Sequence, residues 1–334
     1  GHSCQAVTAV VRAAAGHFAL PLACRIHEGV VFDSCDGRSQ LDRLVEMTLA
    51  LGVSAPALLV ADAYYAAAKV IRPLLAAGWH LISAARMNAV AYRPPPPPPA
   101  GRRGRRRVYG EKVRLRELFD EIAAFVEGPS PIYGERGVTL RYRVADLLWR
   151  PVGIALRFVL VIHPTRGKKI LLCTDLSADP LEIIRVYGIR FKIEVSFKQA
   201  VHTLGTYAYH FWMMAMKPRS RESGNQDVRS EPRAYREAVR RKLRAYQLHI
   251  QAGVVAQGLL QSLAVLQPRA VWRAFGSWLR TIRPGVPPSE RVVALSLRNS
   301  LPQFLADAPE EHSLAKFIRR RVDPGRAEGM RLAS

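Results

Sequence analysis

The stretch "APALLVADAYYAAAKVIRPLLAAGWHLISAAR", residues 55–86, decides the fold of this chain. Its first part, 55–65, opens with a short apolar run that stops at Asp62, which is typical of a buried strand. Helical spacing follows at 66–78, and a second apolar run occupies 79–86. Strand, helix and strand in this order predict a βαβ unit, and therefore a parallel pair of strands in an α/β domain.

Two elements precede this unit and a low-complexity segment follows it. Residues 4–29 hold two apolar runs around "AAAGH", which predicts a β-hairpin. Residues 39–52 have helical spacing that ends on Gly52. The segment 93–107, "RPPPPPPAGRRGRRR", can form neither a helix nor a central strand, so we expect an exposed basic loop.

Four β-like runs separated by Gly and Pro occupy residues 105–175: "RRVYGEKVRL", "GVTLRYRVADLLW", "GIALRFVLVIH" and "KKILLCTD". They predict an antiparallel insertion within the α/β domain, with His163 and Asp175 in turns beside its strands. Helical spacing returns at 179–205, and from 206 onward the chain is helical and basic.

Charge is the clearest feature of the composition. The 334 residues include 50 Lys and Arg against 27 Asp and Glu, a net charge of +23. This excess predicts a polyanionic partner, nucleic acid first and an anionic membrane second. A gene rich in Arg codons is the alternative explanation. The 49% of hydrophobic residues excludes global disorder.

Several function classes are disfavoured. The four cysteines form no CxxC pair, which argues against a zinc site or a disulfide framework and fits a reducing cytoplasm. The nine histidines form no HExxH group, and neither GxGxxG nor GxxxxGK[ST] occurs, so we expect no nucleotide cofactor. The longest apolar stretch, 252–267, is short and interrupted by Gln; we expect a buried helix and no membrane partner.

The candidate site combines a strand-terminal acid with a later helix. Asp62 stands where carboxyl ends of parallel strands form sites, although a helix cap or a turn is an alternative role. The segment "YGIRFKIEVSFK", residues 187–198, has helical spacing that puts four polar side chains on one face: Tyr187, Arg190, Glu194 and Lys198. A solvated ladder of salt bridges is the alternative reading of that face.

Together, two carboxylates suit phosphoryl transfer. Asp62 and Glu194 offer the hard oxygen ligands that hold two Mg²⁺ or Mn²⁺ ions about 4 Å apart, where the ions activate the attacking oxygen and stabilise the leaving one. Arg190 would steady a phosphate or orient Glu194, and Lys198 would contact the DNA backbone. We expect the two carboxylates on the same side of the core, within reach of a shared metal.

These residues carry a resemblance to bacterial insertion-sequence transposases of the DDE type, mobile-element enzymes with a ribonuclease H-like core. Tyr187, Arg190 and Glu194 match the spacing of the group defined by a Tyr-x2-Arg-x3-Glu-x6-Lys motif. Residues 59–71, "LVADAYYAAAKVI", are similar to the family's second-Asp segment, and a β-rich insertion before the Glu is also a family habit. The likeness continues through 197–212 and covers most of the first 215 residues.

The resemblance implies an α/β fold: a ribonuclease H-like core with a mixed sheet and flanking helices, a β-rich insertion and a helical, basic C-terminal region. The expected divisions are 1–90 for the first part of the core, 91–177 for the basic loop and insertion, 178–216 for the helix with the catalytic Glu, and 217–334 for the C-terminal region.

The resemblance also implies the activity, which is cutting and joining of transposon-end DNA by two-metal phosphoryl transfer in the bacterial cytoplasm or nucleoid. Asp62 and Glu194 would be catalytic metal ligands for Mg²⁺ or Mn²⁺, with Tyr187, Arg190 and Lys198 in support. DNA is the implied partner, and a homodimer is compatible with it. DNA contacts are further expected from the arginines of the low-complexity loop: Arg102, Arg103, Arg105, Arg106 and Arg107.

Two departures from the family pattern leave an alternative open. The motif's Lys would fall on Val201, so Lys198 or His202 would take over its contact. The family's first Asp belongs on a strand ahead of the hairpin, yet no Asp precedes Asp33, and Asp33 and Asp36 suit a turn. We therefore expect the first strand and its Asp to be missing, so that the hairpin and "LLVAD" either form separate sheets or close together across the empty position.

The alternative function is a catalytically inactive, DNA-binding transposase remnant. It follows from the missing Asp together with basic segments at 101–107, 233–244 and 316–321. A nuclease of the same fold that acts on RNA ranks below both.

Overall fold

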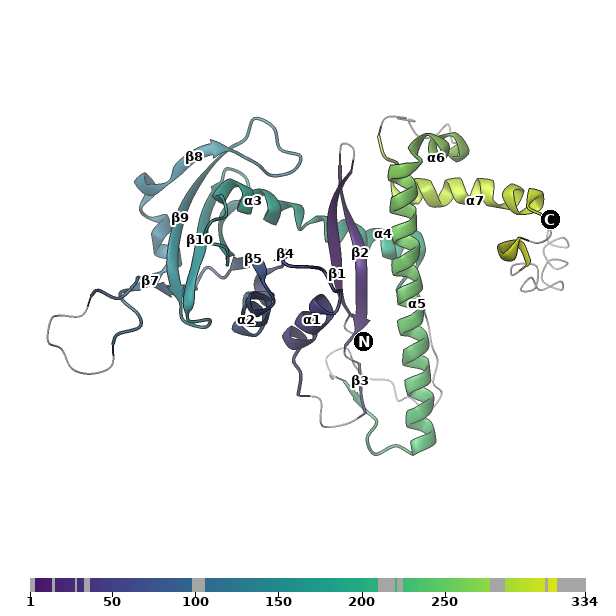
Figure 1. Ribbon diagram of the computed structural model, residues 1–334, viewed down its shortest axis with the longest axis horizontal. Helices are drawn as coiled ribbons and strands as arrows, with labels where there is room; N and C mark the ends of the chain where they lie inside the picture. Colours follow the sequence, from purple (N-terminus) through teal and green to yellow (C-terminus); the bar gives the residue numbers. More distant parts are fainter. Residues whose placement is uncertain are drawn as a thin grey trace.

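The computed structural model describes residues 4–13, 16–27, 29–32, 37–97, 106–209, 220, 225–276, 286–309 and 312–316. The fold is mixed α/β. A large mixed sheet with flanking helices lies beside a two-stranded hairpin, and a long helix runs along the other side of that hairpin (Figure 1). The arrangement is consistent with the predicted ribonuclease H-like core.

The predicted βαβ unit is confirmed. Strand β4 (Ala57–Val60), helix α2 (Ala68–Ala76) and strand β5 (Trp79–Ala85) follow one another, and the two strands pair in parallel. Between β4 and α2 lies the short 3-10 helix η1 (Ala63–Tyr65). Strand β4 is the edge of an eight-stranded sheet in the order β4-β5-β11-β10-β9-β6-β7, with β8 also paired to β9.

The other strands of this sheet are antiparallel to their neighbours, as the sequence predicted for the insertion. They are β6 (Val90–Tyr92), β7 (Lys112–Arg114), β8 (Val126–Pro129), β9 (Thr139–Trp149), β10 (Ile154–His163) and β11 (Gly167–Cys173). Two 3-10 helices lie between β7 and β8: η2 (Leu115–Phe119) and η3 (Ile122–Ala124). Because β11 pairs with β5, one continuous sheet holds strands from both sides of residue 90.

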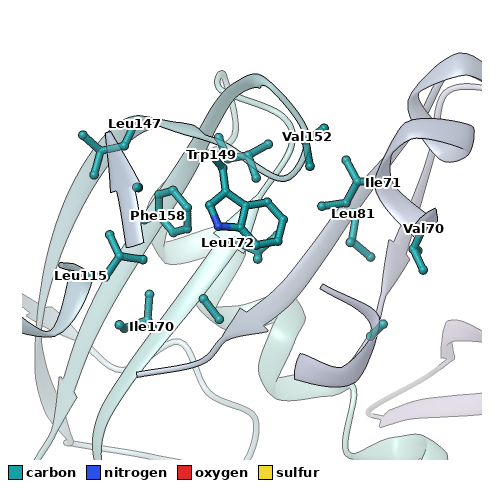
Figure 2. Packing of buried hydrophobic residues seen from close by; sticks show 14 of the residues in the cluster. Val70, Ile71, Leu81, Leu115, Leu147, Trp149, Val152, Phe158, Ile170 and Leu172 are labelled. Atoms are coloured by element: carbon teal, nitrogen blue, oxygen red, sulfur yellow. The ribbon is translucent and has the colours of Figure 1, made fainter. Parts of the chain in front are cut away.

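Both faces of this sheet are covered at its centre, which explains the largely apolar sequences of β5 and β10. Along β10, Phe158 and Leu160 enter a core with α2 and Trp149 of β9 (Figure 2). Val159 points to the opposite face and packs near Ile183 of α3 (Pro180–Ile189). The alternation of side chains along one strand therefore feeds two cores.

The hairpin is a separate sheet, as expected. Strands β1 (Cys4–Ala13) and β2 (Gly16–Ile26) pair only with each other among the described residues. Helix α1 (Gln40–Leu49) connects the two sheets, because Met47 packs with Val7 of the hairpin while Val45 packs in the large core. The helix begins with a capping box made by Ser39 and Asp42.

The C-terminal half is helical, as predicted. It contains α4 (Lys192–Gln199), a π-helical turn (Ala200–Leu204), α5 (Arg233–Leu266), α6 (Pro268–Phe275) and α7 (Glu290–Asp307). A short parallel pair joins β3 (Val30–Val31) to β12 (Gln226–Asp227). By length and composition, α5 could cross a membrane, although a third of its most apolar window is buried within the chain.

Candidate active site

Asp62 lies where the sequence placed it, directly after β4. Its Oδ1 accepts a hydrogen bond of 3.0 Å from the backbone N of Tyr64 and so caps η1. The hydroxyl of Ser83 on β5 donates to the backbone oxygen of Asp62 at 2.7 Å, which fixes the strand end. Asp62 therefore has the helix-capping role that the sequence offered as an alternative. It occupies one carboxylate oxygen, and the exposed side chain presents the other to solvent.

The segment with Tyr187 and Glu194 corrects one expectation. In place of one uninterrupted helix, α3 ends at Ile189 and α4 begins at Lys192. The break contains tighter backbone bonds, from Arg190 N to the oxygen of Tyr187 at 3.2 Å and from Glu194 N to the oxygen of Phe191 at 3.0 Å. Its physical reason is that α3 packs on the large sheet whereas α4 packs on the hairpin.

The break keeps the predicted polar face together. Arg190 Nη2 lies 3.3 Å from Glu194 Oε1, so a salt bridge joins these two residues as the ladder reading proposed. The Arg190 side chain also lies against Tyr187, with its Cζ 5.6 Å from the centre of the tyrosine ring. Arg190 thus ties the last turn of α3 to the first turn of α4.

The charges of Asp62 and Glu194 both influence the hydroxyl of Tyr187. Burial raises the pKa of the Tyr187 hydroxyl; Arg190 opposes the shift, and the negative charges of Asp62 and Glu194 add to it. Tyr187 also packs in the same cluster as Val60, which shortly precedes Asp62. A strand end and a helix 132 residues later in the sequence therefore both act on one tyrosine hydroxyl through their charges.

Lys169 belongs to this site and was missed by the sequence analysis. It stands on β11, and its Nζ lies 5.0 Å from the centre of the Tyr187 ring. Partial burial, together with Arg190 and Arg166, lowers the pKa of Lys169. The only signal in the sequence is a lysine near the start of a strand, and many surface strands share that feature.

Asp62 and Glu194 carry the type of donor group that divalent cations bind. Magnesium is commonly held by one or two carboxylates together with water and substrate oxygens, and Asp62 and Glu194 are both exposed carboxylates. Within the described part of the chain, no three acidic, histidine or cysteine side chains come together as a metal cluster. Asp33 and Asp36 lie outside the described residues, so a third ligand from them is not placed.

The structure describes only some of the residues that were predicted to contact DNA. Lys198 is exposed one turn beyond Glu194 on α4, and Val201 and His202 are both exposed in the π turn that follows. Of the loop arginines, Arg106 and Arg107 are exposed. Three lie outside the described residues: Arg102, Arg103 and Arg105.

A basic cluster at the hairpin tip was not predicted. Arg12 and His17 are direct partners across the hairpin. The His17 ring meets the Tyr133 ring edge-on, with centroids 5.6 Å apart, and Lys192 Nζ lies 4.1 Å from the centre of the Tyr133 ring. Burial lowers the pKa of His17, and the cations of Arg185, Arg12 and Lys192 lower it further. These residues come from four separate segments, so no local motif announces them.

A buried polar pin fixes the loop that carries Tyr133. Glu135 Oε2 lies 3.0 Å from His163 Nε2, and Ser130 Oγ donates to the same oxygen at 2.5 Å. The backbone N of Thr165 donates to His163 Nδ1 at 3.2 Å, which confirms the predicted turn role of His163. The pinned loop lays Ile132 against α3, close to Tyr187.

Comparison with known families points to the same class of protein. The model of the DDE superfamily endonucleases matches residues 28–125, a segment that includes Asp62 and the βαβ unit. This match supports a nuclease or transposase of the DDE type, a superfamily whose members generally use divalent metal ions and whose substrate is DNA. None of the curated proteins matches the chain. The Tyr187–Glu194 segment lies beyond the matched residues.

Proposed function

We propose that this chain is an insertion-sequence transposase of the DDE type, which cuts and joins transposon-end DNA with Mg²⁺ or Mn²⁺. The observation that carries the proposal is the match of residues 28–125, which include Asp62, to DDE endonucleases, and it is supported by the Arg190–Glu194 salt bridge beside Tyr187. The net charge of +23 supports a polyanionic substrate. Its place of action would be the bacterial cytoplasm, on nucleoid DNA.

Each residue of the site has a separate task in this proposal. Asp62 and Glu194 would hold the cation, and a bound Mg²⁺ supplies activation of the attacking oxygen and stabilisation of the leaving oxygen. Arg190 orients Glu194 through the 3.3 Å contact and presents a cation to the phosphate. The Tyr187 ring lies against the Arg190 guanidinium and supports it, and Lys198 neutralises the DNA backbone.

The test is nicking of supercoiled plasmid by the full chain in Mg²⁺ or Mn²⁺, which needs no knowledge of the end sequence. Asp62→Asn and Glu194→Gln should each reduce nicking by about a hundred-fold or more, because each removes a ligand charge from the cation. The matched controls are Asp175→Asn, beyond the neighbouring strand, and Glu182→Gln, on α3. Normal nicking by both site variants, or equal losses in the controls, would contradict the assignment.

A second candidate is the inactive DNA-binding remnant. The observation that favours it is the absence of a three-ligand cluster among the described residues. This protein would bind duplex DNA without nicking it, and log affinity would fall linearly with log salt, by about 0.9 per phosphate neutralised. Binding without metal-dependent nicking therefore selects the remnant, whereas nicking that depends on Asp62 selects the transposase. Preferential cleavage of RNA would exclude both.

A further inference from the structure

Helix α5 has two apolar faces, and the described part of the chain packs against only one of them. The inner face packs on the hairpin and on α7 through a row of buried residues: Tyr246, Ile250, Val254, Gln257, Leu260, Gln261 and Ala264. Its glutamines are engaged inside the chain, since Gln257 Nε2 donates to the Ser196 oxygen at 2.9 Å and Gln261 Nε2 to the Ala19 oxygen at 3.2 Å. The membrane-like hydropathy of α5 therefore comes from both faces together.

The outer face follows a heptad repeat. Its exposed positions alternate in steps of four and three: Leu248, Ala252, Val255, Leu259, Ser262 and Leu266. The four large side chains among them are 60–73% exposed. Apolar residues at this spacing form the contact line of a two-helix coiled coil, in which each side chain inserts between those of a partner helix. These six residues are hereafter the α5 seam, and nothing in the described part of the chain covers them.

The charge pattern identifies the partner. From Ala245 to Pro268 the chain contains no Asp, Glu, Lys or Arg, although its net charge is +23. Two copies of so basic a chain repel each other almost everywhere else. An uncharged, apolar, heptad-spaced face allows two identical helices to approach without that cost, and a symmetric dimer needs one self-complementary surface of this kind.

We propose that two copies of this chain dimerise through the α5 seam, with the two α5 helices packed side by side and antiparallel. This inference concerns assembly and does not depend on the activity of the Asp62–Glu194 site. In an antiparallel pair centred near Gln257, Val255 faces Leu259 of the second copy and Ala252 faces Ser262.

The direction follows from the other half of α5. Its N-terminal part carries six cations against one acid, Glu237: Arg233, Arg236, Arg240, Arg241, Lys242 and Arg244. A parallel pair would set these cations beside their own copies, which is unfavourable at short range. An antiparallel pair sends the two basic halves to opposite ends of the dimer.

Oligomeric state tests the seam. Light scattering on the full chain at 0.3 M salt should give about twice the 37.2 kDa of one copy. Leu259→Glu should give a monomer with an unchanged circular dichroism spectrum, because residue 259 is 60% exposed in the single chain. Val126→Glu, an equally exposed apolar site on β8, is the matched control and should remain dimeric. A monomeric parent chain, or a Leu259→Glu variant that stays dimeric, would overturn the proposal.

Cross-linking tests the direction. When Ala252→Cys and Ser262→Cys chains are mixed, a short bismaleimide should cross-link them into covalent dimers. Each variant alone should give no more covalent dimer than the parent chain, whose yield measures cross-linking through the native cysteines. Self-linking of each variant alone would overturn the antiparallel arrangement. Vesicles of anionic and of neutral lipid provide the last arm, since binding to neutral vesicles that Leu259→Glu abolishes would assign the seam to a lipid surface and overturn the dimer.

Discussion

The large sheet and the hairpin are held in place by different forces. The large sheet buries two apolar cores, one on each face, formed by strand and helix residues. Figure 2 shows the first of them, around Phe158 and Trp149. The hairpin packs in two small apolar clusters, and side chains of neighbouring helices also donate hydrogen bonds to its backbone. Gln247 and Gln251 of α5 each donate to the Cys24 oxygen at 2.7 Å, and Ser196 of α4 donates to the Ala19 oxygen at 3.1 Å.

The difference explains how a two-stranded sheet is maintained. An isolated hairpin is only marginally stable in water because both outer strand edges are unpaired and no core covers its apolar side chains. Here α5 supplies both an apolar face and glutamine donors to β2. The candidate site spans the two regions, since Asp62 belongs to the large sheet and Glu194 to the helix that packs on the hairpin. Its geometry therefore depends on both kinds of packing.

The largest expected effect on stability lies in the large sheet. Phe158→Ala should lower the free energy of unfolding by about 3–5 kcal/mol, because it opens a cavity in a fully buried core. Urea denaturation followed by circular dichroism measures it. Phe304→Ala, at an exposed position on α7, is the control and should change stability little. A loss of unfolding free energy below about 1 kcal/mol at position 158 would contradict the claim that this apolar core stabilises the large sheet.

A smaller loss, confined to the hairpin region, is expected for Gln257→Ala. It leaves the buried Ser196 oxygen and hydroxyl without their donor, at a cost of about 1–3 kcal/mol. Hydrogen exchange should speed up in β2 and α4 while β10 stays protected. Gln267→Ala, at the exposed end of α5, is the matched control. If hydrogen exchange sped up equally in β10, the hairpin region and the large sheet would not be stabilised separately, which would contradict the account.

The stability contributed by the Glu135 hydrogen bonds to His163 and Ser130 should depend on pH. Burial raises the pKa of Glu135, but hydrogen bonds from Ser130 and His163 and the charge of Arg166 outweigh it, so the pKa lies below the ordinary 4.5. A lowered pKa in the folded state stabilises the protein above the unfolded-state pKa and loses that effect as the pH falls through the folded-state pKa.

Glu135→Gln should therefore cost about 1–2 kcal/mol at pH 7 and progressively less below pH 4.5. Denaturation curves at several pH values measure the difference. Glu127→Gln, in an exposed ion pair with Arg141, should show little loss at any pH. A loss at position 135 that does not change with pH would contradict the assigned ion pairing.

The smallest effect is expected at the hairpin tip. Because burial and nearby cations lower the pKa of His17 below 6.5, a bound phosphate should raise it again and draw in a proton. DNA affinity should then rise as the pH falls below about 6.5, by up to about tenfold per unit of pKa change. Fluorescence anisotropy measures this, His17→Gln should flatten the profile, and His80→Gln, at a half-buried position on β5, should not. An unchanged profile in His17→Gln would exclude the tip from DNA binding.

The sequence predicts the large sheet well, because its signals are local. The apolar runs and helical spacing of 55–86 establish β4, α2 and β5, and Asp62 follows from the strand end. The break at Arg190 is not predictable in this way, since it arises from two helices that pack on different sheets. Lys169 and the hairpin-tip cluster are not predictable from local sequence either, because their contacts with Tyr187 and Tyr133 join segments that are distant in the chain.

The central claim is that Asp62 and Glu194, from two separately packed regions, hold one cation between them. Calorimetric titration of Mn²⁺ into the full chain, Asp62→Asn, Glu194→Gln and the double variant tests it directly. A shared ion predicts that either single change removes nearly all the binding and that the double variant loses no more, since the two ligands act as one unit. Binding losses that simply add, or Mn²⁺ affinity that survives both changes, would contradict it.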